Sequence, residues 1–122
     1  MSLVARHIEA DGIPTVIMGC AKDIVEHCGV PRFLFSDFPL GNSAGRPLDV
    51  DSQRQTLELA FRVLESAPAP RTTVQSPQRW SADASWKRDY NDLTTLTPEK
   101  IAERRKEFDV VKSVARAKRE GT

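Results

Sequence analysis

The sequence has few of the residues and patterns that mark specialised classes of protein. It contains only two cysteines, Cys20 and Cys28, which are too few for a disulfide framework and lack the second pair that a zinc site needs. No apolar run is long enough to cross a membrane, and the N-terminus lacks the charged-then-apolar layout of a signal peptide. These absences predict reduced thiols, no metal site, no membrane partner and a cytoplasmic location.

Charge and glycine spacing exclude two further classes. The formal net charge is only +1, and the basic excess after residue 70 is interspersed with acidic residues that would repel phosphate groups. No glycine-rich phosphate-binding fingerprint follows either of the strands predicted below. We therefore expect no nucleic-acid partner and no cofactor.

Two short apolar runs predict the strands of a parallel sheet. Residues 15–18 (TVIM) and 32–35 (RFLF) are unbroken apolar segments, a pattern typical of strands that have helices on both faces. Amphipathic helical patterns precede the first run, separate the two runs and follow the second. The sequence thus predicts an α/β fold, a small parallel-sheet unit in the order helix, strand, helix, strand, helix.

The third of these helices has the most regular pattern. It is predicted to begin after an aspartate N-cap, either Asp49 or Asp51. Its predicted inward face consists of four apolar residues spaced three or four positions apart, namely Leu57, Ala60, Phe61 and Leu64.

Proline and aromatic residues divide the remainder of the chain. The stretch 67–70 (APAP) cannot continue a helix and predicts a stiff spacer, so we expect an α/β domain at 1–66. Residues 67–96 form a predicted Pro/aromatic docking segment that contains a candidate edge strand at 71–74 together with Trp80 and Trp86. These sparse aromatic residues are expected to pack on this domain, on a second copy or on another chain.

Residues 97–122 are predicted to form a long C-terminal helix. Thr97 is the expected N-cap and Pro98 the first helical residue. The apolar residues of this helix make a narrow stripe at heptad-like spacing, which suits packing against a partner: Ile101, Phe108, Val111, Val114 and Ala115.

The segment after the second strand is the predicted ligand site. Loops at the carboxyl ends of parallel strands leave backbone groups and helix N-termini free for ligands, and a loop that continues from residue 36 to 48 is long for a connection. Glycine permits close backbone approach, and the Asn42 amide offers both a donor and an acceptor. An Ω-loop without a ligand is the alternative. The predicted substrate-binding residues are Ser36, Asp37, Pro39, Gly41 and Asn42.

Cys20 is the candidate catalytic residue. It lies where the first strand turns into the next helix, a corner at which free backbone N–H groups and the helix dipole favour the thiolate. Asp23 and His27 follow three and seven positions later, so a Cys/His/Asp arrangement is one hypothesis. A purely structural cysteine is the other, since a carboxylate near Cys20 would oppose ionisation.

Three motifs resemble a known family. Residues 12–16 (GIPTV), 31–32 (PR) and 39–42 (PLGN), in this order and spacing, resemble the C-terminal part of the selenoprotein B component of glycine, sarcosine and betaine reductases, with D-proline reductase as a related case. The resemblance covers roughly residues 3–64. It implies reductive cleavage of a substrate bond by a selenocysteine or cysteine, with a neighbouring thiol and thioredoxin-like donors completing the cycle.

The resemblance also implies where the reactive residue belongs. In that family it lies just upstream of the helix that precedes the GIPTV motif, and Cys20 does not occupy the matching position. We therefore expect a small subunit, not active alone, that forms part of a substrate pocket in a hetero-oligomer whose redox Cys/Sec is supplied by a second chain. A glycine-like substrate would present a carboxylate, for which Arg32 and Arg46 are available. The alternatives are a non-catalytic binding or assembly subunit and a stand-alone thiol enzyme that uses Cys20.

Overall fold

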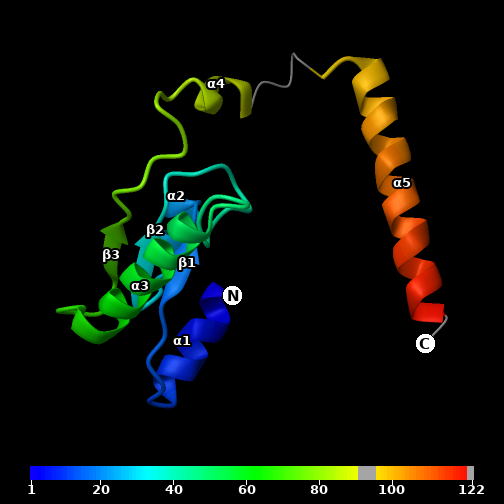
Figure 1. Ribbon diagram of the computed structural model, residues 1–122. Helices are drawn as coiled ribbons and strands as arrows, with labels where there is room; N and C mark the ends of the chain where they lie inside the picture. The colour runs from blue at the N-terminus through cyan, green and yellow to red at the C-terminus, as the bar shows by residue number, and fades with distance from the viewer. Residues whose placement is uncertain (91–95, 121–122) are drawn as a thin grey trace. The chain divides into compact units, whose positions relative to one another are not determined.

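The computed structural model describes residues 1–90 and 96–120, and the chain divides into two compact units, Met1–Asp83 and Ala84–Thr122 (Figure 1). The first unit contains α1 (Ser2–Ala10), β1 (Ile17–Gly19), α2 (Lys22–Cys28), β2 (Arg32–Phe35), α3 (Val50–Ser66) and β3 (Thr72–Gln75). The second contains α4 (Trp86–Tyr90) and α5 (Pro98–Glu120). The predicted division into an α/β domain at 1–66, a docking segment at 67–96 and a C-terminal helix at 97–122 stays a prediction. Residues 91–95 and 121–122 lie outside the described chain.

The sheet confirms the predicted α/β fold. Its three strands are all parallel and lie in the order β1-β2-β3, with Gly19 opposite Phe35 and Phe35 opposite Gln75. The strand β2 has its predicted limits, and β3 is the edge strand suggested by residues 71–74. Because the strands are parallel and in register, their carboxyl ends reach the same edge of the sheet.

The first strand begins two residues later than predicted. The backbone N–H of Thr15 donates to Oε1 of Glu9 in α1, and the Thr15 hydroxyl donates to the same carboxylate oxygen at 3.2 Å. Nη1 of Arg32 lies 2.5 Å from that oxygen as well. Thr15 therefore joins a polar cluster that ties α1 to the amino end of β2, and pairing with β2 starts only at Ile17.

Helices α2 and α3 pack on opposite faces of the sheet. On one face, a Cβ added at Gly19 would lie 3.1 Å from the Phe33 ring and 3.6 Å from Val25 of α2. On the other face, Met18 lines a hollow together with Leu57 of α3. The buried apolar core gathers around β2 and consists of Ala5, Val30, Phe33, Leu34, Phe38, Ala60 and Val63.

The inward face of α3 differs from the predicted one. Leu57 and Phe61 were expected to face the sheet, but their exposed fractions are 49% and 54%. The buried side chains of this helix are Ser52, Thr56, Ala60 and Val63.

A glutamine beyond β3 explains this rotation of the helix. The hydroxyl of Ser52 donates to Oε1 of Gln78 at 2.5 Å, and Nε2 of Gln78 donates to the hydroxyl of Thr56 at 2.8 Å. The Ser52 hydroxyl also accepts from the backbone N–H of Arg46 at 3.0 Å, and the Thr56 hydroxyl donates to the carbonyl of Ser52 at 2.9 Å, so each buried hydroxyl has more than one partner. The side of α3 that carries the Ser52 and Thr56 hydroxyls faces inward, and a stripe with Leu57 and Phe61 lies at the surface.

The second unit consists mainly of the predicted C-terminal helix. The hydroxyl of Thr97 accepts from the backbone N–H of Lys100 at 3.4 Å, which confirms the predicted N-cap. All side chains described from Thr97 to Arg119 are exposed. None of the helices within residues 1–90 and 96–120 combines the length and apolarity needed to cross a membrane.

Candidate functional site

Three small polar side chains directly follow the three strands. Cys20 follows β1, Ser36 follows β2 and Ser76 follows β3. The backbone N–H of Ser36 donates to the carbonyl of Gly19 at 2.9 Å, and that of Ser76 donates to the carbonyl of Phe35 at 2.8 Å. The ladder therefore continues one residue past β2 and past β3, and a thiol and two hydroxyl groups follow the three neighbouring strand ends. We call these three residues the edge row.

The loop after β2 is a tight, internally bonded structure. Both the backbone N–H and the side-chain Nδ2 of Asn42 donate to the carbonyl of Pro39, at 3.2 and 3.0 Å. Gly41 within this turn has a φ of +95°, which a side chain would strain. Phe38 is buried beneath the loop, and the Trp80 ring packs on it with 5.5 Å between ring centroids. Trp80 thus docks on the first unit, which was one of the three expected positions.

Cys20 lies against this loop. Burial raises the pKa of the Cys20 thiol, the backbone N–H groups of Asn42 and Phe38 lower it in part, and the Asp37 carboxylate raises it further. The net direction is upward, so the expectation of a favoured thiolate is wrong. The corner does supply the expected N–H donors, but they come from the loop, and burial outweighs them.

The suggested Cys/His/Asp arrangement has no support in the geometry. Cys20 precedes α2 and is not part of that helix, whereas Asp23 and His27 are exposed residues within it. The carboxylate that acts on the Cys20 thiol is that of Asp37. Cys20 and Cys28 are both free thiols.

Ser36 occupies the middle of the edge row. Its exposed fraction is 1%, and its hydroxyl oxygen has no hydrogen-bond partner among the described residues. Buried hydroxyl groups nearly always have a partner. A ligand or a water molecule that reaches this end of β2 would therefore find an unused donor and acceptor in the Ser36 hydroxyl.

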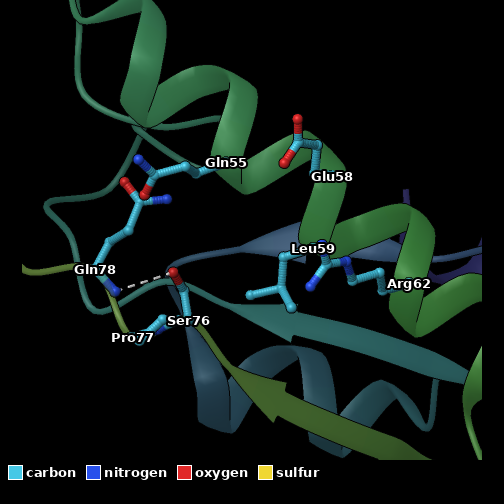
Figure 2. A pocket seen from close by; sticks show the side chains of 7 residues that line it. All are labelled: Gln55, Glu58, Leu59, Arg62, Ser76, Pro77 and Gln78. Carbon is cyan, nitrogen blue, oxygen red and sulfur yellow. Dashed lines mark hydrogen bonds between the residues drawn. The ribbon is translucent and has the colours of Figure 1, made fainter.

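Sequence reasoning missed the contribution of the third strand. The Ser76 hydroxyl accepts from the backbone N–H of Gln78 at 3.3 Å, as the dashed line in Figure 2 shows. Placing residues 71–74 as a third parallel strand would have predicted Ser76 at this edge. Nothing in the local pattern indicates that Gln78 reaches α3, because that contact depends on how the two segments pack.

A hollow of about 220 Å³ opens between α3 and the segment after β3. Ser76 belongs both to its wall and to the edge row, and Gln55 of α3 points toward Gln78 in Figure 2. The lining residues are Gln55, Glu58, Leu59, Arg62, Ser76, Pro77 and Gln78.

The two arginines considered for a substrate carboxylate have other partners. Arg32 lies at the amino end of β2, opposite the edge row, where it pairs with Glu9. Arg46 lies near the start of α3, pairs with Asp49 at 2.8 Å and donates to the carbonyl of Arg79 at 3.3 Å. Only Arg46 therefore lies at the carboxyl end of the sheet.

The carboxylate of Asp49 completes this side of the site. It accepts from the backbone N–H of Ser52 at 2.9 Å and so caps α3, which decides between the two predicted caps. That N–H group and the Arg46 side chain hold the pKa of Asp49 below its ordinary value. Within the described residues no three His, Cys, Asp or Glu side chains come together as a possible metal site.

Comparison with known proteins gives one informative similarity. No family model matches the chain, and no solved structure matches it. The chain is 30% identical to D-proline reductase subunit gamma from Acetoanaerobium sticklandii over 80 residues, which are 66% of this chain and 33% of that protein. The chain is similar to a D-proline reductase subunit.

This similarity bears on the resemblance predicted from the three motifs. D-proline reductase was the related case within that resemblance, and the similarity supports it at a distant level. The matched region spans about a third of the length of the A. sticklandii subunit. The likeness to glycine, sarcosine and betaine reductases stays a prediction.

Proposed function

We propose that this chain is a subunit of a D-proline-reductase-like enzyme and that it forms one wall of the pocket for a small amino-acid substrate. The observation that carries the proposal is the convergence, at the carboxyl edge of the sheet, of Cys20, the unpartnered Ser36 hydroxyl and the Pro39–Asn42 turn. The similarity to a D-proline reductase subunit supports the reaction class.

Each proposed substrate-binding residue has a distinct role. The Ser36 hydroxyl, which has no hydrogen-bond partner among the described residues, is suited to a substrate carboxylate, because a neutral donor can bind an anion without a full counter-charge. The Asp37 carboxylate is suited to the cationic nitrogen of the same substrate. Pro39, Gly41 and Asn42 hold the turn that sets the position of these groups.

The proposed reaction is a two-electron reduction. The substrate bond breaks, and each of its two atoms takes up one hydrogen. Two thiol groups, or a thiol and a selenol, supply the electrons and protons and become joined as a disulfide or selenylsulfide. A dithiol donor then reduces that bond and restores the enzyme.

We assign the reacting thiol or selenol to a partner chain. The raised pKa of Cys20 keeps it largely protonated at neutral pH, which makes it a poor nucleophile. The exposed stripe of α3 with Leu57 and Phe61, beside the unpaired edge of β1, offers a surface that a partner would cover. A role as a non-catalytic assembly subunit would use the same surface.

A stand-alone thiol enzyme is the second candidate. The observation in its favour is the pair of backbone N–H groups, of Phe38 and Asn42, that face Cys20. Such a pair would stabilise negative charge that develops beside the sulfur atom.

Substrate binding and chemistry are tested separately. In a Trp86→Phe background the fluorescence of Trp80, which packs on Phe38 of the loop, should change on titration with D-proline more than with L-proline. The affinity for D-proline that this titration gives should fall at least tenfold in Ser36→Ala and in Asn42→Asp. It should not fall in Ser66→Ala, at the exposed end of α3. Equal responses to both enantiomers would contradict the substrate assignment.

Reductase activity then distinguishes the sources of the redox group. Dithiothreitol-dependent consumption of D-proline should require the chain together with a Cys- or Sec-containing partner. It should survive Cys20→Ser and be lost on Asn42→Asp. Activity of the chain alone that is abolished by Cys20→Ser would establish the stand-alone thiol enzyme instead.

A further inference from the structure

The helix α5 presents an apolar stripe that is exposed among the described residues of the chain. Ile101, Phe108 and Val111 are exposed by 49%, 64% and 65%. With Ile101 at position a of a heptad, Phe108 and Ala115 also fall at a and Val111 falls at d, so all four lie along one line of the helix. In proteins most of the stability of a helix comes from packing of its apolar face rather than from helix propensity. The stripe is therefore a surface for a second helix.

The charges beside this stripe restrict what can pack on it. Arg105, Lys112 and Arg119 follow one another at seven-residue spacing and occupy three of the four e positions of α5, the first being Pro98 at the start of the helix. Side chains at e flank the contact and meet the e or g positions of the partner helix. One whole side of the stripe is thus positively charged.

A second copy of α5 is a poor partner for this arrangement. In an antiparallel pair the two columns of Arg105, Lys112 and Arg119 would face each other, and like charges at that distance are destabilising. In a parallel pair Glu107 would face Lys112, but Lys100 would face Arg105. Neither orientation gives each basic side chain an acidic neighbour.

A nucleic acid or an anionic membrane fits less well than a protein. Acidic side chains at Glu103, Glu107 and Asp109 interrupt the basic surface and would repel phosphate groups. Arg104 at a d position interrupts the apolar stripe, which a membrane-bound helix would bury in the lipid.

We infer that α5 is the docking site for an acidic amphipathic helix of a partner protein. The apolar residues of the partner pack on Ile101, Phe108 and Val111, and its Asp or Glu side chains face Arg105, Lys112 and Arg119. This pairing is independent of the reductase proposal, because no residue of the first unit takes part in it.

The experiment measures binding of the full chain to two designed peptides. Both peptides are about three heptads long with Leu at a and d; one has Glu and the other has Lys at every e and g position. We expect the labelled Glu peptide to bind about twentyfold more tightly by fluorescence anisotropy at low salt, from three attractive pairs in place of three repulsive ones. Reversing Arg105, Lys112 and Arg119 to Glu should exchange the preference.

Matched variants separate the stripe from the rest of the helix. Val111→Asp should reduce binding of the Glu peptide at least tenfold, whereas Val110→Asp should not, although the two valines are exposed by 65% and 62%. Lys106→Glu, at the outward f position, is the control for Lys112→Glu. Circular dichroism of each free variant checks that α5 still forms.

Four outcomes would overturn the inference. These are equal affinity for the two peptides, equal loss from Val110→Asp and Val111→Asp, self-association of the chain in sedimentation experiments, and tighter binding to phosphatidylserine vesicles or to duplex DNA than to the Glu peptide. Discrimination between the peptides together with dependence on Val111 supports it.

Discussion

Replacing Gly45 by alanine tests how the loop after β2 is joined to α3. Gly45 has a φ of +108°, and a Cβ added there would lie 2.8 Å from both the Cα and the N of Gln53 in the first turns of α3. Gly41 has a φ of +95° but no heavy atom within 4 Å of such a Cβ. Both alanine variants therefore lose stability because alanine must adopt an unfavourable backbone conformation. Only Gly45→Ala also places a methyl group against a neighbouring segment.

The two costs give a clear difference in stability. A left-handed backbone conformation costs about 1–2 kcal/mol for a residue with a Cβ. Inserting a methyl group into occupied space adds about 1–3 kcal/mol, and here the obstructing atoms belong to a helix backbone that cannot rotate away. We expect Gly41→Ala to lower the free energy of unfolding by about 1 kcal/mol and Gly45→Ala by about 3–4 kcal/mol. For a unit of this size each kcal/mol corresponds to about 4–8 °C in Tm.

Urea unfolding in a Trp86→Phe background provides the assay. Trp80 fluorescence reports on the loop through its contact with Phe38, and far-UV circular dichroism reports on the helices. Gly12→Ala is a second control, since Gly12 has a φ of +83° and open space at its Cβ position. Equal losses for Gly45→Ala and the two control variants would refute the close approach of the loop to α3.

Three further predictions concern ionisable side chains. Glu9→Ala should lower the free energy of unfolding by about 3 kcal/mol by urea unfolding, because it leaves the largely buried Arg32 guanidinium unpaired, whereas Asp51→Ala removes an exposed 3.8 Å contact and should change it by less than about 1 kcal/mol. When the rate of iodoacetamide reaction with Cys20 is plotted against pH, its midpoint should lie above the pKa of an ordinary thiol. Asp37→Asn should lower this midpoint, since Asp37 raises the pKa of Cys20. An unchanged midpoint would contradict the contact. Because the folded pKa of Cys20 is raised, its contribution to stability is full below the unfolded pKa and is lost as the pH rises through the folded value. The folded pKa of Asp49 is lowered, so its contribution is present above the unfolded pKa and is lost as the pH falls; Asp49→Asn keeps a capping oxygen and should reduce the loss of stability measured in acid.

The strands and their helices were largely predictable because their signals are local. The strand β2 and the capping of α5 by Thr97 follow from short patterns that need no distant partner. The prediction was wrong where a side chain outside the local pattern competed for a backbone N–H group of the strand. Thr15 was expected in a strand, but the Glu9 carboxylate accepts its backbone N–H and withdraws it from the sheet.

The positions of the candidate site residues that follow the strands could be predicted, but the residues that pack against them could not. Parallel strands send their following residues to one edge, so Ser36 and the loop to Asn42 could be assigned there from order alone. The approach of that loop to Cys20 brings together residues that are far apart in the chain, and the resulting burial reversed the expected direction of the thiol pKa. The placement of Ser76 and Gln78 required the third strand.

The sequence alone determined the α/β order, the position of the loop after β2 and the stripe of α5, because each depends on spacing within a few helical turns or along one strand. Tertiary structure decided which face of α3 is buried. Apolar periodicity favours Leu57 and Phe61 inside, but on another side of the helix the Ser52 hydroxyl donates to Gln78 and the Thr56 hydroxyl accepts from it. These bonds link α3 to the segment after β3 through the Ser52 and Thr56 side, and the apolar stripe with Leu57 and Phe61 is left exposed.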